Sequence, residues 1–342
     1  MKAMQLKRLG NLQDNDQPLE MTELPLPVPG AGEVLIKVSA CGVCHTELDE
    51  IEGRTPPPKL PVIPGHQVVG RVVEIGAGDT SLQPGERVGV GWIFSACGNC
   101  EYCRAGNENL CMSFRATGRD ANGGYAEYMV VPEAFCYPIP NLISDTDAAP
   151  MLCAGAIGYR SLNLAAIQDG DTLGLTGFGG SAHLVLKMAK YRFPNSEIFV
   201  FTRSSKEQEF ARSLGASWAG DIEATPPELI DSIIDTTPVW KPILNGLENL
   251  KPGGRLVINA IRKESTDHDL LLQLDYSKHL WMEKEIKSVA NVTRADITEF
   301  LKLAAYAHIK PDTQTYSLSA ANIALAELKH GRVHGSKVLL ID

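Results

Sequence analysis

The sequence lacks an apolar run long enough to cross a lipid bilayer. Its longest apolar stretch lies around residues 148–159, well short of the roughly 20 residues that a spanning helix needs. Residues 1–17 also contain no apolar run of the kind found in a secretory signal. These absences predict a cytoplasmic protein with no membrane partner.

The sequence also lacks an excess of positive charge. It has 32 Lys and Arg against 41 Asp and Glu, a formal net charge of −9. An acidic chain is repelled by the phosphates of nucleic acids and by anionic lipid headgroups. We therefore expect a small-molecule partner and no nucleic-acid partner.

Internal repeats and low-complexity segments are missing as well, so the chain is expected to fold as ordinary domains. Its 342 residues exceed the size of one usual core, which predicts two domains. Residues 33–90 carry short β-branched runs broken by Gly and Pro, which predict strands. From about residue 170, strands alternate with amphipathic helices, which predicts a parallel, doubly wound sheet. Helices at 293–309 and 321–330 and a strand at 336–341 are expected to follow.

Cysteine, by contrast, is plentiful: eight residues, four of them within fifteen positions. Paired C-x-x-C turns bring thiolates into the tetrahedron that Zn²⁺ prefers, at about 2.3 Å from the metal. The sequence therefore predicts a closed, structural zinc site rather than disulfides in a reducing compartment. Four free buried thiols and an iron–sulfur cluster are the alternatives. The predicted ligands are Cys97, Cys100, Cys103 and Cys111.

A second metal site is indicated by three residues that are far apart in the sequence. Cys44, His66 and Cys153 form the ligand set of a catalytic zinc, which keeps its fourth position open for water or substrate. Taken singly, each of these residues is more often simply buried. Their combination with the cysteine loop and a dinucleotide-binding pattern favours the metal site.

The dinucleotide-binding pattern is a glycine-rich turn between an expected strand and an expected helix. Gly177 allows a tight turn, and Gly179 lets the backbone approach a pyrophosphate. The N-terminus of the following helix presents N–H groups and a partial positive charge to that anion. The turn consists of Gly177, Phe178, Gly179, Gly180, Ser181 and Ala182.

The end of the next strand predicts which cofactor is preferred. An enzyme that prefers NAD carries Asp or Glu there, about 20 residues past the glycine-rich turn, to bind the ribose hydroxyls. Here residues 198–201 run into a segment without an acid, whose hydroxyl and cationic groups can bind a 2′-phosphate. We therefore predict NADP(H), with NAD(H) as the alternative. The segment is Thr202, Arg203, Ser204, Ser205 and Lys206.

Over its whole length the chain resembles the zinc-dependent alcohol dehydrogenases of the medium-chain dehydrogenase/reductase family. The matching motifs are CGVCHTEL, PGHQVVG, the Cys97–Cys111 loop, GGYAEY, the Cys153 segment, GFGGSA and HGRVHGSKVLL. The resemblance implies an α/β fold, with a GroES-like catalytic domain at 1–152 and 292–342 and a Rossmann domain at 153–291. It further implies two zinc ions per chain, an alcohol or aldehyde substrate, and a homodimer or homotetramer.

The resemblance also assigns roles to single residues. Cys44, His66 and Cys153 would bind the catalytic zinc, and Glu47 would orient the histidine without touching the metal. Thr46 would hold the substrate hydroxyl and pass its proton on. The remaining assignments are His45 and Arg332 at the cofactor, and Trp92 and Phe114 at the substrate pocket.

Three positions depart from the family pattern. Gln67 stands where Glu is common, Asp49 stands where many members have a relay histidine, and residues 156–158 replace a segment that often contains Thr. Asp49 is then either a proton acceptor or a solvated surface carboxylate. Two rival functions also remain: a zinc-free reductase of the same superfamily, and a non-catalytic zinc or redox-sensing protein.

Overall fold

The structure is a computed structural model that describes residues 1–331 and 335–342. It divides into two compact units. Unit 1 comprises Met1–Cys153 and Thr293–Asp342, and unit 2 comprises Ala154–Val292. Among the described residues, no helix combines the length and apolarity needed to cross a membrane.

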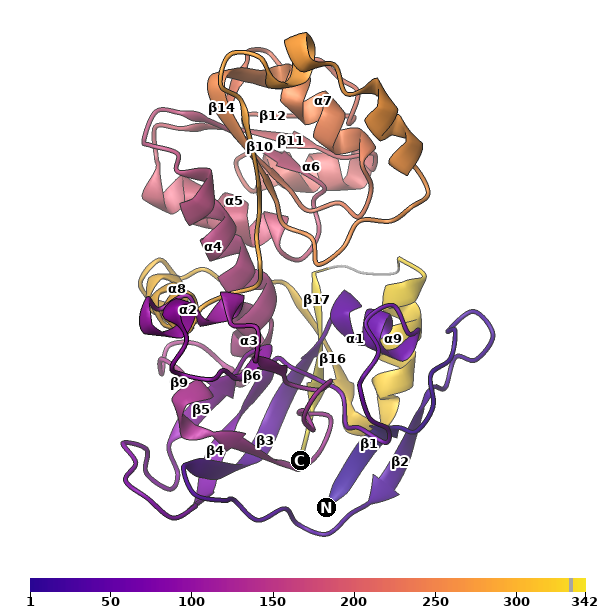
Figure 1. Cartoon of the computed structure of the whole chain (residues 1–342), viewed down its shortest axis with the longest axis vertical. Coiled ribbons are helices and arrows are strands. Elements are labelled where there is room, and N and C mark those ends of the chain that lie inside the picture. Colours follow the sequence, from indigo (N-terminus) through magenta and orange to yellow (C-terminus); the bar gives the residue numbers. More distant parts are fainter. Residues whose placement is uncertain (332–334) are drawn as a thin grey trace. The chain divides into compact units, whose positions relative to one another are not determined.

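Unit 1 is built on a mostly antiparallel sheet with the strand order β16-β17-β3-β4-β5-β9, and β8 also pairs with β3. The C-terminal strand β17, yellow in Figure 1, runs antiparallel beside β3, drawn in indigo. Strand β3 is central because it pairs with β17, β4 and β8, and most of its residues are buried. The bounds are β3 Glu33–Val43, β4 Val68–Ile75, β5 Arg87–Val90, β8 Tyr128–Pro132, β9 Cys136–Pro138, β16 Thr313–Ser317 and β17 Ser336–Leu340.

Shorter elements complete unit 1. Two antiparallel pairs lie outside the large sheet, β1 with β2 and β6 with β7. The bounds are β1 Lys2–Leu6, β2 Leu19–Glu23, β6 Ile93–Ser95, β7 Arg115–Ala116, α1 His45–Ile51, α2 Glu101–Arg104, α3 Asp145–Pro150, α8 Arg294–Tyr306 and α9 Ala321–Lys329. The two helices and the final strand expected after residue 292 are confirmed.

The prediction that residues 33–90 are wholly β is wrong at one place. Helix α1 interrupts the strands directly after β3. Cys44 has an extended backbone and caps this helix, and the Glu47 side chain accepts a hydrogen bond from the Cys44 N–H in return. This is a capping box with cysteine in the place of the usual serine or threonine. The helix spans only seven residues, which is too short to show a helical period among the surrounding strand patterns.

Unit 2 is a six-stranded, fully parallel sheet with the order β12-β11-β10-β13-β14-β15. The predicted doubly wound sheet is therefore confirmed, and the order reverses between β10 and β13, where such sheets bind ligands. All five residues of β10 are buried, as expected for an inner parallel strand. The bounds are β10 Thr172–Thr176, β11 Glu197–Phe201, β12 Trp218–Gly220, β13 Ile230–Asp235, β14 Leu250–Ile258 and β15 Glu285–Ser288.

The helices of unit 2 connect these strands. Helix α5 leads from β10 to β11, α6 from β11 to β12, and α7 from β13 to β14 (Figure 1). The apolar face of α7, through Ile243 and Leu247, packs on a core of aromatic and aliphatic side chains from β11, β13 and β14. The bounds are α4 Ala156–Ala165, α5 Ala182–Arg192, α6 Ser205–Ser213 and α7 Lys241–Asn249.

Candidate functional site

The first candidate ligand is fixed by the capping box at the start of α1. The Cys44 N–H donates to Glu47 Oε2 at 2.8 Å, and the Thr46 N–H donates to Cys44 Sγ at 3.4 Å. Formation of α1 thus fixes the orientation of both the Cys44 thiol and the Glu47 carboxylate. Glu47 is fully buried.

The second candidate ligand, His66, is oriented by the same carboxylate. Glu47 Oε1 lies 2.5 Å from His66 Nδ1, which leaves Nε2 facing Cys44 Sγ at 3.7 Å. The preceding Gly65 has φ +97°, and a Cβ there would lie 2.3 Å from the Tyr125 ring. Glycine is therefore required for the chain to bring His66 against α1.

The third candidate ligand, Cys153, lies on a π-helical segment, Met151–Gly155, that follows α3. Such π-bulges often occur at functional sites because they redirect one side chain. The ligand atoms of Cys44, His66 and Cys153 all lie within 4.8 Å of one another. The structure therefore brings the three predicted residues together.

Electrostatics show what this cluster is suited to hold. The Cys153 side chain, burial and the Glu47 carboxylate all raise the pKa of the Cys44 thiol well above 9.0. Burial lowers the pKa of His66, but Glu47 and Cys44 outweigh it and raise that pKa well above 6.5. Without a metal, the cluster thus retains protons against a buried negative charge. A divalent cation would displace those protons and compensate that charge.

The four-cysteine loop is also assembled as the sequence predicts. The sulfur atoms of Cys97, Cys100, Cys103 and Cys111 lie within 4.8 Å of one another. Backbone N–H groups of Asn99 and Cys100 are the main groups that lower the pKa of the Cys97 thiol, to about 6. Four protein sulfurs leave no position for substrate, so this site can serve structure rather than chemistry.

The two residues expected at the substrate pocket are in contact. The Trp92 and Phe114 rings have centroids 5.1 Å apart, and the Arg119 guanidinium lies over both at 5.5 and 5.7 Å. The buried Trp92 Nε1–H has no hydrogen-bond partner among the described residues. Arg119 was not expected from the sequence, since a lone arginine in a loop carries no periodic signal.

Sequence reasoning also missed Glu50, which lies one turn beyond Glu47 on α1. Glu50 is 2% exposed, and neither of its carboxylate oxygens accepts a hydrogen bond from the described residues. Burial first, and then repulsion by Glu47, raise the pKa of Glu50 from 4.5 to about 8. The i, i+3 spacing from Glu47 was the signal that could have identified it.

Asp49 is buried, so its interpretation as a solvated surface carboxylate is wrong. It is 4% exposed and forms an ion pair with Arg54, which also pairs with Glu52. Glu52 in turn accepts from Lys329 of α9 at 2.8 Å. Asp49 therefore belongs to an ionic network that joins α1 to α9. Gln67, the other departure, is 3% exposed.

The glycine-rich turn of unit 2 has the geometry that anion binding needs. Gly177 follows β10 with φ +76°, and a Cβ added at Gly179 would contact nothing within 4 Å. Ser181 is the N-cap residue of α5, and the helix begins at Ala182. The turn therefore exposes its backbone at Gly179, at the N-terminus of a helix.

The segment after β11 is more constrained than the sequence suggested. Thr202 is buried, and its hydroxyl donates to Glu207 Oε2. Ser204 caps α6 by accepting from the Glu207 N–H at 3.4 Å. The side chains of Arg203, Ser205 and Lys206 are exposed. Glu207 is an acid that sequence reasoning passed over because it lies inside the helix.

The two other residues predicted to contact the cofactor are His45 and Arg332. His45, the first residue of α1, is exposed. Arg332 lies outside the described residues.

Glu50 generates a prediction about pH. Its raised pKa means that the folded protein retains a proton that the unfolded chain releases near pH 4.5, so folding stability falls as the pH rises from 4.5 to about 8. Replacing Glu50 by Gln should flatten this fall. The measurement is denaturant unfolding of both proteins across that range.

Glu20 provides the control, because Lys7 lowers the pKa of this exposed carboxyl. Glu20→Gln should alter the slope of stability against pH only below about pH 4.5, and should leave the slope between pH 4.5 and 8 as in the wild type. Parallel pH curves for wild type and Glu50→Gln would contradict the account of Glu50.

Comparisons with known proteins show what this chain is similar to. Residues 30–141 match the model of the alcohol dehydrogenase GroES-like domain. A probable alcohol dehydrogenase of Mycobacterium tuberculosis is 44% identical and spans 100% of this chain and 97% of its own length.

Solved structures give the same result. A cobalt- and zinc-bound thermostable alcohol dehydrogenase from Pyrobaculum aerophilum has a TM-score of 0.87 and 25% identity, covering 99% of both chains. A putative zinc-binding dehydrogenase from Sinorhizobium meliloti bound to NADP has a TM-score of 0.85 and 25% identity, covering 99% of this chain and 98% of its own. This chain belongs to the alcohol dehydrogenases of the medium-chain dehydrogenase/reductase family.

Proposed function

We propose that this alcohol dehydrogenase depends on zinc and interconverts alcohols with aldehydes or ketones by hydride exchange with a nicotinamide cofactor. One observation carries the proposal: Cys44, His66 and Cys153 converge within 4.8 Å, and Glu47 bonds to both Cys44 and His66. Unit 1 would act as the catalytic domain and unit 2 as the cofactor-binding domain.

The donor set fits zinc. Two thiolates and an imidazole match the ligand preference of Zn²⁺ at catalytic sites, and the four-cysteine set matches structural sites. A bound Zn²⁺ would supply Lewis acidity, which lowers the pKa of an alcohol and polarises a carbonyl. A zinc-free reductase and a non-catalytic protein would have no use for an open ligand set supported by a buried carboxylate.

The side chains around the ligands have defined tasks in this proposal. Glu47 holds His66 with Nε2 toward the metal position and raises its basicity. Thr46 accepts the proton of the substrate hydroxyl, and Trp92 and Phe114 bound the pocket. Asp49, a buried carboxylate that pairs with Arg54, would take the proton onward. A bound nicotinamide cofactor would supply the hydride acceptor or donor, and His45 and Arg332 would contact the cofactor's phosphates or ribose.

The two metal sites should separate in mutagenesis. Cys153→Ser removes a ligand of the open site only, so zinc should fall from two ions per chain to one and turnover by at least about 100-fold, with little change in Tm. Cys103→Ser removes a ligand of the closed site and should chiefly lower Tm, because a structural zinc contributes folding energy. Zinc analysis, thermal unfolding and initial rates on a panel of alcohols and aldehydes measure all three.

Cys136→Ser is the matched control, because this buried thiol belongs to neither cluster. It should leave the zinc content unchanged. Wild-type turnover in Cys153→Ser would show that the catalytic ligands are misassigned.

We further propose that the cofactor is NADP(H). Arg203, Ser205 and Lys206 are exposed directly after β11, where a doubly wound sheet places the adenine ribose. An exposed guanidinium, ammonium and hydroxyl suit a 2′-phosphate. The rival, NAD(H), would need a carboxylate at the ribose, and Glu207 instead accepts from Thr202.

Arg203→Ala tests the preference. Loss of one charged hydrogen bond should lower kcat/KM for NADP(H) by about tenfold or more and leave NAD(H) nearly unaffected. Lys302→Ala, which removes an exposed positive charge on α8 of unit 1, is the control and should leave kcat/KM for both cofactors unchanged. A wild type that prefers NAD(H), or a variant that loses both cofactors equally, would overturn the preference.

We also propose that the enzyme is a homo-oligomer that associates through β15. This strand forms an edge of the unit 2 sheet, and all four of its side chains are exposed. Exposed apolar residues accompany it: Leu272, Leu274, Tyr276, Trp281, Met282 and Ile286. An edge strand presents unpaired backbone N–H and C=O groups to a further strand, and a second copy offers the same edge in a self-complementary, two-fold arrangement.

Light scattering tests this surface. Ile286→Lys introduces a charge on the edge strand and should shift a dimer to monomer, or a tetramer to dimer. Ile323→Lys, at an exposed position of α9 in unit 1, should leave the mass unchanged. Retention of the wild-type mass by Ile286→Lys, or a monomeric wild type, would contradict the proposal.

A further inference from the structure

A buried ion pair lies at the point where the strand order of unit 2 reverses. Asp235 is the last residue of β13, and Lys263 follows β14. Lys263 Nζ lies 2.5 Å from Asp235 Oδ2, and the two side chains are 8% and 0% exposed. Burying two charges costs several kcal/mol each before their attraction is counted, so the pair is weak evidence for stability alone.

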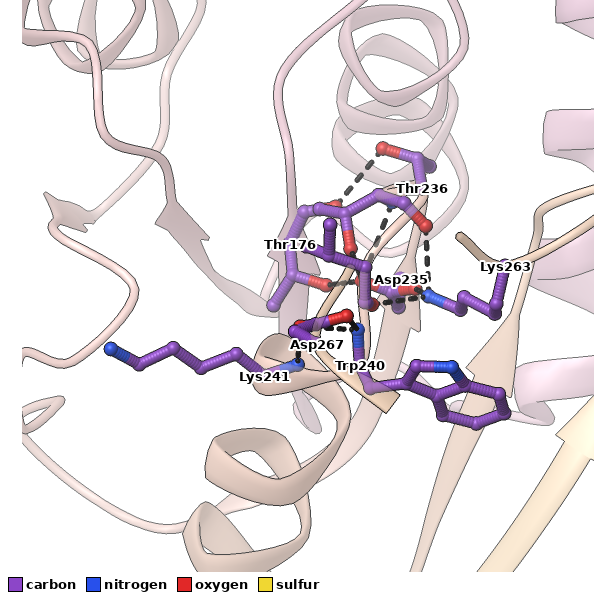
Figure 2. Close-up of polar contacts among 9 residues, drawn as sticks. Thr176, Asp235, Thr236, Trp240, Lys241, Lys263 and Asp267 are labelled. Atoms are coloured by element: carbon purple, nitrogen blue, oxygen red, sulfur yellow. Dashed lines mark hydrogen bonds and ion pairs between the residues drawn. The ribbon is translucent and has the colours of Figure 1, made fainter. Parts of the chain in front are cut away.

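The pair fixes the loop between β13 and α7. Besides Asp235, Lys263 Nζ donates to the carbonyl oxygens of Thr237 at 2.8 Å and Val239 at 2.9 Å. Figure 2 shows Lys263 directed at Asp235, with the carboxylate between it and Thr176. All three donors of the ammonium are thus occupied, two of them by loop carbonyls.

Asp235 ties the same loop to β10. Its Oδ1 accepts from the Thr176 hydroxyl at 2.6 Å and from the Thr237 hydroxyl at 2.8 Å. Thr176 is the residue immediately before the glycine-rich turn. The Thr236 hydroxyl donates to the Thr176 carbonyl at 3.0 Å, and a Cβ at Gly177 would lie 2.8 Å from Thr236 Oγ1.

The far end of the loop is fixed separately. Asp267 accepts from the backbone N–H groups of Trp240 and Lys241 at 2.9 Å each (Figure 2), and these groups open helix α7. The Trp240 ring packs against the core of unit 2 and lies 6.0 Å from Lys263 Nζ. Residues 236–240 are therefore held at both ends and in the middle.

The position of loop 236–240 on the sheet indicates which part of a dinucleotide would lie beside it. The adenine ribose lies after β11, and a dinucleotide crosses the reversal point to the other half of the sheet. That half begins with β13. Its next strand, β14, is followed by Asn259, whose side chain donates to Ser181 Oγ of the glycine-rich turn at 3.3 Å.

We propose that Asp235 and Lys263 are positioning residues that pre-organise loop 236–240 for the nicotinamide nucleotide half of the cofactor. Neither side chain contacts the cofactor, because the ammonium and the carboxylate are already occupied by the loop. The inference rests on the proposed cofactor site of unit 2. When binding requires one loop conformation, the apparent Kd rises in proportion as that conformation becomes less populated.

The test uses the zinc-loaded, full-length enzyme and two halves of the cofactor. Asp235→Asn and Lys263→Met each leave one buried charge without its partner and should raise the Kd of NADPH and of reduced nicotinamide mononucleotide about tenfold. The Kd of 2′,5′-ADP, which reports the adenosine half, should not change. Lys263→Arg keeps the charge and should recover most of the affinity. Binding is followed by fluorescence or calorimetry, with zinc content and Tm as checks of folding.

An ion pair at the opposite end of the same strand, whose side chains are 40% and 27% exposed, is the control. Asp231 pairs with Lys251 at 2.7 Å and accepts from the Thr172 N–H of β10 at 2.8 Å. Asp231→Asn and Lys251→Met should leave the Kd of both halves unchanged. Unchanged NADPH binding in Asp235→Asn and Lys263→Met, or equal weakening of both halves, overturns the positioning role. A wild type that binds neither NADPH nor NADH overturns the cofactor site itself.

Discussion

The arrangement of the candidate active site depends on one carboxylate. Glu47 accepts the Cys44 N–H with one oxygen and contacts His66 Nδ1 with the other, so a single side chain caps a helix and orients two metal ligands. A fully buried carboxylate is costly unless it is paired, and here its partners are the groups that a metal requires. Folding of α1 therefore fixes Cys44 and, through Glu47, the orientation of His66.

In unit 2, buried charged side chains likewise fix the conformation of the neighbouring backbone. Asp235 and Lys263 are charged, buried and saturated with hydrogen bonds, and the groups they bond to belong to loops at the carboxyl ends of β10 and β13. In both units, a buried charge specifies a backbone conformation. Removing one partner is expected to disturb function more than removing an exposed ion pair, whose contribution is small.

Much of this could be predicted from the sequence, because its signals are local or chemically specific. The parallel sheet followed from alternating strands and helices, and both metal clusters followed from cysteine and histidine identity and spacing. The sequence could not predict α1, since a seven-residue helix has too few turns to show a period. Nor could it predict Glu50, Arg119, Asp235 or Lys263, whose roles arise from burial and from partners distant in sequence. The environment of Asp49 is set by its burial and by its ion pair with Arg54. Neither can be inferred from the amino-acid composition.

The central claim is that the protein scaffold pre-forms an open zinc site from Cys44, His66 and Cys153. X-ray anomalous scattering at the zinc absorption edge tests it directly, on crystals of protein purified without added metal. The account predicts two peaks per chain, one among these three side chains and one among the four cysteines of residues 97–111. A map with only the second peak, or with neither, would contradict it.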